Sequence, residues 1–341
     1  MALIVRKPGL WTTVQDAGRT GWQRYGVPVG GPMDAASHAA ANVLAGNEPG
    51  AAALELTLAG GAFETTADVR IAVCGADLEP YVDDAPLPMW RPVVVPAGTT
   101  IRFGTARAGR YAYVAVAGGF DTPQALGSRS TAAKGGFEAS IGRPLQVGDR
   151  LPIADPAAVL ASAGESRSPT AAYPRWHLGE AWRFSAPDAA GERTVRALRG
   201  REWERFDPIV RGSIERGEWT CTVQSASDRM GYRMAASLPA AVRTDQLSEA
   251  VTAGTVQVPP DGMPIALMAD RQTTGGYPRL LQIAAVDIGL LAQARPGDVV
   301  RFELIELEQA VDAYMERLER LRWLRERIRW AEREEEGRSR L

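Results

Sequence analysis

The chain has 341 residues, in which 39 Lys and Arg stand against 41 Asp and Glu, so its formal net charge is −2 at pH 7. A chain of this length predicts two domains, because a single hydrophobic core seldom grows so large. The interspersed charges exclude the concentrated basic face of a nucleic-acid-binding protein, and the sequence lacks the apolar run of ~20 residues that a membrane span needs. We therefore expect a cytoplasmic protein that binds neither nucleic acid nor membrane.

A short helix and a series of short strands are predicted in chain order. The helix is expected after Asp34, which is an N-cap candidate. Short Val- and Ile-rich segments bounded by glycine and proline then predict a mainly β fold. These segments are 70–77, 91–103, 109–120, 254–262, 263–270 and 297–305. Two cysteines in apolar runs, Cys74 and Cys221, lack zinc or CxxC spacing and are predicted to be reduced core residues.

The final segment, 306–341, predicts a long, charged amphipathic helix. Apolar residues recur at alternating spacings of three and four, at Leu304, Leu307, Val311, Tyr314, Leu318 and Leu321. This stripe is typical of a helix that packs on its own domain. Trp323 and Trp330, seven residues apart and so on roughly one face, favour the alternative that the helix also docks a partner subunit.

Four sequence features recur in the same order in the two halves of the chain, which indicates an internal duplication. Residues 13–15 (Thr-Val-Gln), followed by Arg19 and Gly21, recur at 222–224, followed by Arg229 and Gly231. The other three pairs are 54–60 with 248–254, 76–77 with 269–270, and 98–103 with 297–302. The halves are joined by 156–174, which is rich in Ala, Ser and Pro and predicts a connecting segment. We assign 1–155 to the first half and 175–305 to the second.

Few of the usual catalytic signatures are present. The only two histidines, His38 and His177, lie in no metal-binding pattern and beside no nucleophile motif. We expect no metal site. The sequence also has no GxxxxGK[ST] loop, so any ATP that the protein uses is expected to bind in another way, at a site that the sequence does not locate.

Three polar clusters at strand ends are the candidate binding and catalytic sites. In the first, Gln15, Asp16 and Arg19 precede a glycine-rich stretch, and Arg19 is a candidate clamp for an anionic group. An ion pair between Asp16 and Arg19 is the structural alternative. The second cluster contains Ser227, Asp228 and Arg229 among seven mostly polar residues, which are expensive to bury unless paired or bound to a ligand. The third contains Asp270, Arg271, Gln272, Thr273 and Tyr277.

The third cluster follows an apolar strand and includes Gly275 and Gly276, which favour a hairpin turn. Asp270 is a candidate base, Arg271 a cation, and Gln272, Thr273 and Tyr277 are candidate substrate-binding residues.

The motifs TTVQDAGRTGWQRYGVPVGGPMD, GSRST, GREW, SDRMGYR, SEAVTAGTVQVPPDG and MADRQTTGGYP, in this order, resemble the family of 5-oxoprolinase C subunits and biotin-dependent carboxyltransferases (allophanate hydrolase subunit 2). The resemblance covers nearly the whole chain and ends at about Glu306. It implies two cyclophilin-like β-barrels, which agrees with the duplication. In the urea carboxylase branch, the region matching Ser227 to Arg229 lines the substrate pocket, so the resemblance implies a binding role for these three residues.

The resemblance implies three functions. The first is the C-type subunit of an ATP-dependent 5-oxoprolinase complex, which opens 5-oxo-L-proline to glutamate together with an A-type subunit and a kinase-inhibitor-like B-type subunit. The second is the carboxyltransferase part of a biotin-dependent urea or amide carboxylase, in which case biotin would be carried elsewhere because the sequence has no biotinylation motif. The third is a non-catalytic regulator that binds a kinase-inhibitor-like protein. The first is our expectation, with Asp270, Arg271, Asp228 and Arg229 as catalytic residues in a chain that is inactive alone.

Overall fold

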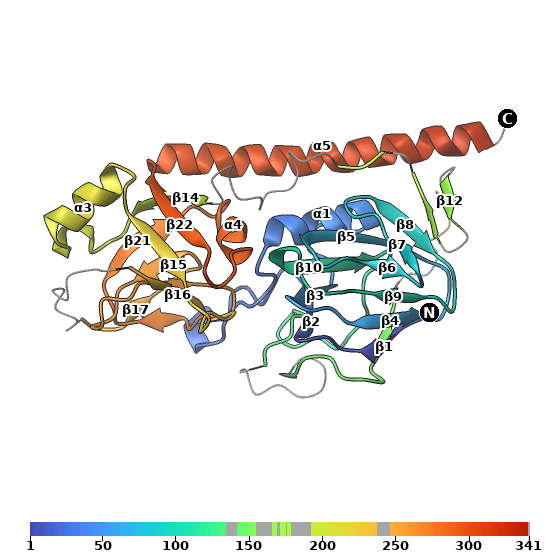
Figure 1. Ribbon diagram of the computed structural model, residues 1–341, viewed down its shortest axis with the longest axis horizontal. Helices are drawn as coiled ribbons and strands as arrows, with labels where there is room; N and C mark the ends of the chain where they lie inside the picture. Colours follow the sequence, from blue (N-terminus) through green and yellow to red (C-terminus); the bar gives the residue numbers. More distant parts are fainter. Residues whose placement is uncertain are drawn as a thin grey trace. The chain divides into compact units, whose positions relative to one another are not determined.

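The computed structural model describes residues 1–133, 142–154, 166–168, 171–174, 176–178, 192–236 and 246–339. The chain divides into two compact units (Figure 1). Unit 1 comprises Met1–Gly18, Ala35–Phe184 and Leu318–Leu341, and unit 2 comprises Arg19–Asp34 and Ser185–Arg317. The segment Arg19–Asp34 therefore lies in the first half of the sequence but belongs to unit 2.

Unit 1 is built from two sheets. One is six-stranded, in the order β11-β1-β4-β9-β6-β7. Its strands are β1 (Ala2–Lys7), β4 (Ala62–Thr65), β6 (Tyr81–Val82), β7 (Ala85–Pro86), β9 (Thr100–Arg102) and β11 (Arg150–Pro152). The other is seven-stranded, in the order β12-β13-β8-β5-β10-β3-β2. Its strands are β2 (Thr12–Gln15), β3 (Ala53–Thr57), β5 (Val69–Asp77), β8 (Pro92–Val95), β10 (Ala108–Val116), β12 (Ser166–Ser168) and β13 (Ala171–Tyr173).

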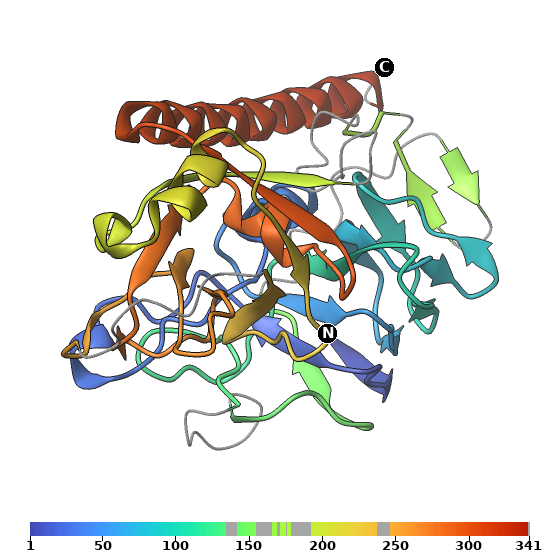
Figure 2. The ribbon, with the colours of Figure 1, turned by 60° about the vertical axis from the view of Figure 1, so that its left-hand side comes forward.

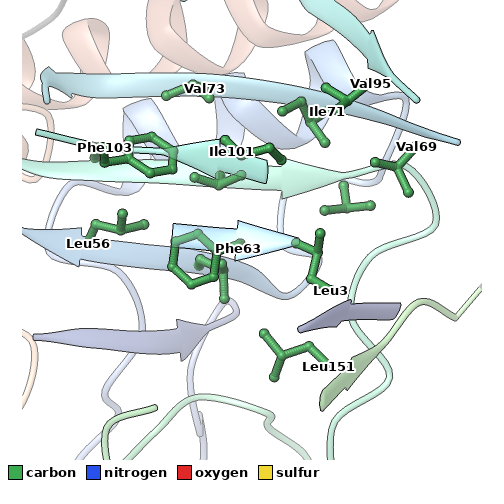
Figure 3. Packing of buried hydrophobic residues seen from close by; sticks show 14 of the residues in the cluster. Leu3, Leu56, Phe63, Val69, Ile71, Val73, Val95, Ile101, Phe103 and Leu151 are labelled. Carbon is green, nitrogen blue, oxygen red and sulfur yellow. The ribbon is translucent and has the colours of Figure 1, made fainter. Parts of the chain in front are cut away.

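The core of unit 1 is apolar and draws side chains from both sheets. Figure 3 shows Leu3, Phe63 and Ile101 of the six-stranded sheet near Leu56 and Ile71 of the seven-stranded sheet. Because side chains alternate along a strand, the residues between these core positions point to the opposite face. On the seven-stranded sheet, that face is covered by helix α1 (Ala35–Ala45), which lies against β5 and β10.

Helix α1 confirms the helix predicted after Asp34, and six of its eleven residues are alanine, whose small side chain allows a close approach to the sheet. His38 on this helix is 2% exposed, and its Nε2 lies 3.0 Å from the carbonyl oxygen of Gln15. His38 is therefore a buried residue with a structural contact inside unit 1.

Unit 2 contains a closed barrel, in the order β14-β21-β18-β19-β16-β15-β22. Its strands are β14 (Arg193–Arg199), β15 (Thr220–Val223), β16 (Gly231–Ala235), β18 (Thr255–Gln257), β19 (Ile265–Leu267), β21 (Arg279–Ile283) and β22 (Val299–Leu304). The parallel pairing of β14 with β22 is the only parallel one among these strands. The predicted mainly β fold is confirmed, and each of the six predicted apolar segments contains a strand.

Short elements decorate the barrel. They are the strand pair β17 (Glu249–Ala250) and β20 (Thr274–Gly275), the helices α3 (Pro208–Glu215) and α4 (Ile288–Ala292), and the 3-10 turns η1 (Gln23–Tyr25) and η4 (Trp203–Arg205). Helix α3 begins where the side chain of Asp207 accepts a hydrogen bond from the backbone N–H of Ile209 and Pro208 occupies the first turn.

The long C-terminal helix α5 (Leu307–Ser339) confirms the predicted helix (red in Figures 1 and 2). The stripe expected to be buried is wrong in its first part, because Leu307, Val311 and Tyr314 are 61%, 51% and 46% exposed. Among the described side chains of the helix, the buried ones are Leu324 and Ile328. Apolar residues form more than one row at helical spacing on α5. Spacing alone therefore could not predict which row is buried.

Two strands lie within the stretch predicted as a connecting segment. β12 and β13 pair with each other, and β13 extends the seven-stranded sheet beside β8. The rest of 156–174, apart from Pro174, lies outside the described residues. In the described part of the chain, no helix combines the length and apolar character needed to cross a bilayer.

Both cysteines are buried thiols, Cys74 at 0% and Cys221 at 1% exposure. Burial raises the pKa of the Cys221 thiol, because the thiolate would have to form without water. We expect neither cysteine to react with a thiol reagent at pH 8 in the native protein, and both to react in urea. A colorimetric thiol titration measures this, and one rapidly reacting thiol in native protein would contradict the burial.

Candidate functional site

An ion pair between Arg229 and Asp270 lies at the centre of the candidate site in unit 2. Arg229 precedes β16 and Asp270 follows β19, and these strands pair with Gly231 opposite Leu267. The ladder continues past the strand ends, since the backbone N–H of Asp270 donates to the Arg229 carbonyl at 2.8 Å. Sequence positions 41 residues apart are thereby placed side by side.

The geometry of this pair is a two-pronged fork. Arg229 Nε donates to Asp270 Oδ2 and Nη2 donates to Oδ1, both at 2.8 Å. The arginine side chain is 9% exposed and the aspartate side chain 23%. Planar bidentate contacts fix orientation as well as charge, so Asp270 is a rigidly positioned carboxylate.

Arg229 also holds the segment Arg19–Asp34. Its Nη2 donates to the carbonyl oxygen of Gly31 at 2.7 Å. At the end of this segment, Asp34 Oδ2 accepts from Gln293 Nε2 at 3.0 Å, and a Cβ added to Gly289 would lie 2.5 Å from Asp34 Oδ1. Glycine at 289 therefore permits the close approach of Asp34, and the segment is fastened to unit 2 at both places.

Ser227 and Asp228 shape the turn that leads to Arg229. The Ser227 hydroxyl accepts from the backbone N–H of Arg233 at 3.1 Å and lies 3.2 Å from its carbonyl oxygen. Asp228 Oδ1 accepts from the backbone N–H groups of Met230 and Gly231 at 2.8 and 3.2 Å. Both side chains thus have structural contacts within the cluster, in addition to any role in binding.

The loop after Asp270 differs from the hairpin that the sequence predicted. A turn at Gly275 is wrong, because residues 274–275 form strand β20, which pairs with β17. Glycine at 275 serves this packing instead, since an added Cβ would lie 2.5 Å from the side-chain amide nitrogen of Gln257. A glycine pair signals either a turn or a close approach, and local sequence does not distinguish the two.

The candidate residues of this loop differ in their exposure. Arg271 is buried, Gln272 is exposed and Thr273 lies between these extremes. The Thr273 carbonyl accepts from the backbone N–H of Val251, next to the β17–β20 pair. Tyr277 is 42% exposed, and its carbonyl oxygen accepts from the side-chain amides of Gln246 and Gln257.

Residues of the first predicted cluster divide between the two units. Gln15 and Asp16 belong to unit 1, whereas Arg19 belongs to unit 2, where it is 1% exposed and its backbone N–H donates to Val29. The alternative of an Asp16–Arg19 ion pair is wrong. The Asp16 carboxylate is bound instead by residues of the segment 128–130 and by Gly18.

Asp16 is one of the best-satisfied carboxylates in unit 1. The hydroxyls of Ser128 and Ser130 donate to Oδ1 at 2.5 and 2.6 Å, and the backbone N–H of Arg129 donates to Oδ2 at 2.6 Å. Burial alone would raise the pKa of Asp16, but these hydrogen bonds and the one from Gly18 outweigh it and hold the pKa below its usual value. Asp16 therefore fixes two loops of unit 1 to each other.

Sequence reasoning missed a second ion-pair group in unit 2. Arg279 donates through Nε and Nη2 to Glu202 at 2.8 and 2.6 Å, and Nη2 also contacts Glu249 at 2.7 Å. Glu202 lies in the GREW motif, and a Cβ at the preceding Gly200 would meet the Arg279 carbonyl at 2.2 Å. The motif was visible in the sequence, but its partner on β21 was not.

The sequence pattern described as "Carboxyltransferase domain, subdomain A and B" matches residues 25–304 of this chain. The chain belongs to this carboxyltransferase-domain family. The match covers the unit 2 barrel and the ion pair of Arg229 with Asp270, and it ends where β22 ends.

Two relatives of the carboxyltransferase-domain chain are similar over almost their whole length. It is 36% identical to the 5-oxoprolinase C subunit of Haemophilus influenzae over 319 residues, covering 91% of this chain and 95% of the relative. It is also 36% identical to the 5-oxoprolinase C subunit of Escherichia coli over 332 residues, covering 94% and 98%.

Solved structures of larger enzymes contain the same architecture. The crystal structure of the K. lactis urea amidolyase matches 95% of this chain with a TM-score of 0.83 and 26% identity, and the chain covers 20% of that protein. The Kluyveromyces lactis urea carboxylase matches 95% with a TM-score of 0.84 and 26% identity, and the chain covers 29% of it. The carboxyltransferase-domain fold therefore occurs both as a separate chain and as part of multidomain proteins.

The chemistry available in the described part of this carboxyltransferase domain is that of carboxylates, guanidinium groups and amides. No group of three or more His, Cys, Asp or Glu suited to a metal ion occurs among the described residues. Asp270 is an acceptor held in one orientation, and Arg271 is a buried cation next to it in the chain. Such an arrangement suits the binding and polarisation of an amide substrate.

Proposed function

We propose that this chain is the C-type subunit of an ATP-dependent 5-oxoprolinase, in which it binds 5-oxo-L-proline and helps to open the lactam to L-glutamate. Support comes from two relatives named as C subunits of 5-oxoprolinase, each 36% identical and covered over at least 95% of its length. By contrast, the chain covers only 20% of the urea amidolyase structure that it resembles. The chain therefore corresponds to almost the whole of each 5-oxoprolinase relative, but to only one part of the urea amidolyase.

The observation that carries the proposed chemistry is the forked pair of Arg229 and Asp270. Opening a lactam requires a polarised carbonyl and a group that orients or exchanges a proton with the ring nitrogen or a water. Asp270 is the candidate for that second role, because Arg229 fixes both of its oxygens. Arg229 is then a positioning residue, and Arg271 is a buried cation that can bind an anionic group of the substrate.

The proposal also includes ATP and two partner chains, which act with this chain in one complex. Amide hydrolysis coupled to ATP needs an activated carbonyl, and we assign the ATP site to the assembled complex of this chain with its A-type and B-type partners. The chain is expected to be inactive alone and to work in the cytoplasm. Asp228, Ser227, Gln272, Thr273 and Tyr277 are the proposed surroundings of the substrate, and substrate binding stays the proposed role of Gln15, Asp16 and Arg19.

A second candidate function is the carboxyltransferase part of a biotin-dependent urea or amide carboxylase. The observation in its favour is the TM-score of 0.83 to 0.84 with urea amidolyase and urea carboxylase structures. In that case biotin would be carried by another protein. A non-catalytic regulator that binds a kinase-inhibitor-like protein is the third alternative, and it would add no activity to its partner.

One assay separates these functions. The chain is mixed with its A-type and B-type partners, or with a biotin carboxylase and its biotin carrier, and ATP hydrolysis is measured with 5-oxoproline or urea, with and without bicarbonate and avidin. We expect stimulation by 5-oxoproline, no need for bicarbonate and no effect of avidin. Stimulation by urea that requires bicarbonate and is blocked by avidin would favour the carboxylase instead.

A further inference from the structure

Arg271 is a buried cation whose guanidinium has little to bind within the described chain. The residue is 8% exposed, and its Nη1 donates to the Met268 carbonyl at 3.3 Å. Its Nε is buried and has no hydrogen-bond partner among the described residues. Burial lowers the pKa of Arg271, and no acid of the described chain counteracts this effect.

Three other arginines of unit 2, one buried and two half-buried, show what a guanidinium can bind in this unit. Each of the three uses the same edge of the guanidinium, Nε together with Nη2, to hold both oxygens of one carboxylate. The three pairs are Arg196 with Asp287 at 2.9 and 2.7 Å, Arg229 with Asp270 at 2.8 and 2.8 Å, and Arg279 with Glu202 at 2.8 and 2.6 Å. Arg271 has the same edge, but no carboxylate of the described chain meets it.

The adjacent acid cannot serve as that carboxylate. Asp270 directs both oxygens to Arg229, so the pair is neutral and leaves the charge of Arg271 uncompensated. A buried charge without a partner destabilises a folded protein strongly. Proteins retain such groups where a ligand supplies the opposite charge.

We propose that Arg271 binds the carboxylate of the substrate through its Nε and Nη2 edge, and that it thereby selects a lactam that bears a carboxylate over a neutral amide. This inference rests on the proposed function, because it names the part of 5-oxoproline that the site recognises.

The charges around Arg271 favour a carboxylate over a polyphosphate. Arg229, Asp270 and Arg271 together carry one net positive charge, which matches a monovalent anion. A triphosphate would need more cations or a cradle of backbone N–H groups, and it would lie next to the Asp270 carboxylate. Urea has no anionic group, so Arg271 would leave a buried cation unpaired when urea binds.

The test compares two substrates in the reconstituted three-subunit complex. KM and kcat are measured for 5-oxo-L-proline and for its neutral carboxamide, 5-oxo-L-prolinamide, with wild type, Arg271→Gln and Arg271→Lys. In Arg271→Gln we expect KM for 5-oxoproline to rise roughly 10- to 100-fold with little change in kcat, while KM for the carboxamide stays the same. Arg271→Lys, which keeps the charge but not the fork, should lie between the two.

Controls distinguish recognition from folding. Arg216→Gln removes an exposed cation of the same unit, 60% exposed, and should change neither KM. Thermal unfolding of the Arg271 variants reports their stability. An equal loss of activity toward both substrates, an unchanged KM for 5-oxoproline, or a rise confined to the KM for ATP would each overturn the assignment.

The proposed function and this inference can fail separately. If the wild-type complex does not cleave 5-oxoproline, the proposed function is wrong. Binding of 5-oxoproline to wild-type and Arg271→Gln complexes, followed by ligand-observed NMR, then tests Arg271 alone. Binding that disappears in the variant supports the carboxylate site, and absent or unchanged binding contradicts it.

Discussion

Arg229→Ala is expected to reduce ATP-dependent cleavage of 5-oxoproline by the complex to roughly 1% of wild type or less, because a misplaced catalytic group loses about 100-fold in rate. The substitution frees both oxygens of Asp270 and releases the carbonyl of Gly31. It should also lower the free energy of unfolding by about 3 kcal/mol, since it leaves a half-buried carboxylate without its partner. Urea denaturation and glutamate release measure the two effects.

Asp270→Asn separates catalysis from packing. The amide keeps the size of the side chain but removes its charge and one acceptor, so we expect activity to fall as far as in Arg229→Ala with a smaller loss of stability. Arg216→Ala is the matched control, because its pair with Glu218 is exposed on both sides and contributes little to stability. Full turnover in both Arg229→Ala and Asp270→Asn would exclude this pair from the site.

Asp16→Ala is expected to lower the free energy of unfolding by about 3 kcal/mol, the largest effect predicted in unit 1. The substitution removes the acceptor of two hydroxyl groups and two backbone N–H groups, which would then lack partners in a half-buried place. Denaturant unfolding measures the effect. Asp84→Ala is the control, because that side chain is fully exposed, and equal stability of the two variants would contradict the role of Asp16.

Stability should depend on pH through the same residue. The pKa of Asp16 is lower in the folded than in the unfolded state, so its contribution is complete above the unfolded value of about 3.9 and is lost as pH falls through the folded value. Wild type should therefore lose more stability than Asp16→Asn between pH 6 and pH 3. Parallel curves for the two proteins would contradict this interpretation.

Local sequence patterns were sufficient to predict many of the strands and the helix after Asp34. Valine- and isoleucine-rich segments with glycine and proline at their ends became strands, and the N-cap candidate Asp34 preceded a real helix. The echo of 76–77 by 269–270 also has a structural counterpart, since both lie at the end of an apolar stretch that contains a strand. These features depend on neighbours in sequence, which is why composition and spacing identified them.

Other features depend on contacts that spacing does not encode. Asp16 was expected near Arg19, three residues away, but its partners Ser128 and Ser130 are more than 110 residues distant. The buried face of α5 was assigned to the row from Leu304 to Leu321, because several apolar rows fit a helical period and only packing selects one. Segment Arg19–Asp34 belongs to unit 2 through contacts such as that of Gly31, for which the sequence carries no signal.

The candidate site was predicted in part from the sequence. Asp270, Arg271 and Arg229 were singled out by their density of charge, and the structure adds that Arg229 and Asp270 bind each other while Arg271 has no acidic partner in the described chain. Sequence could name the members of the cluster but not their pairing, because the pairing follows from the register of β16 and β19.

The most direct test of the account is glutamate formation from 5-oxo-L-proline and ATP by the A-type and B-type partners, with and without this chain. We predict stoichiometric glutamate and ADP only when the chain is present, and none when it is added alone. Glutamate formed at the same rate in its absence would contradict the central claim that this carboxyltransferase-domain chain is an essential 5-oxoprolinase subunit.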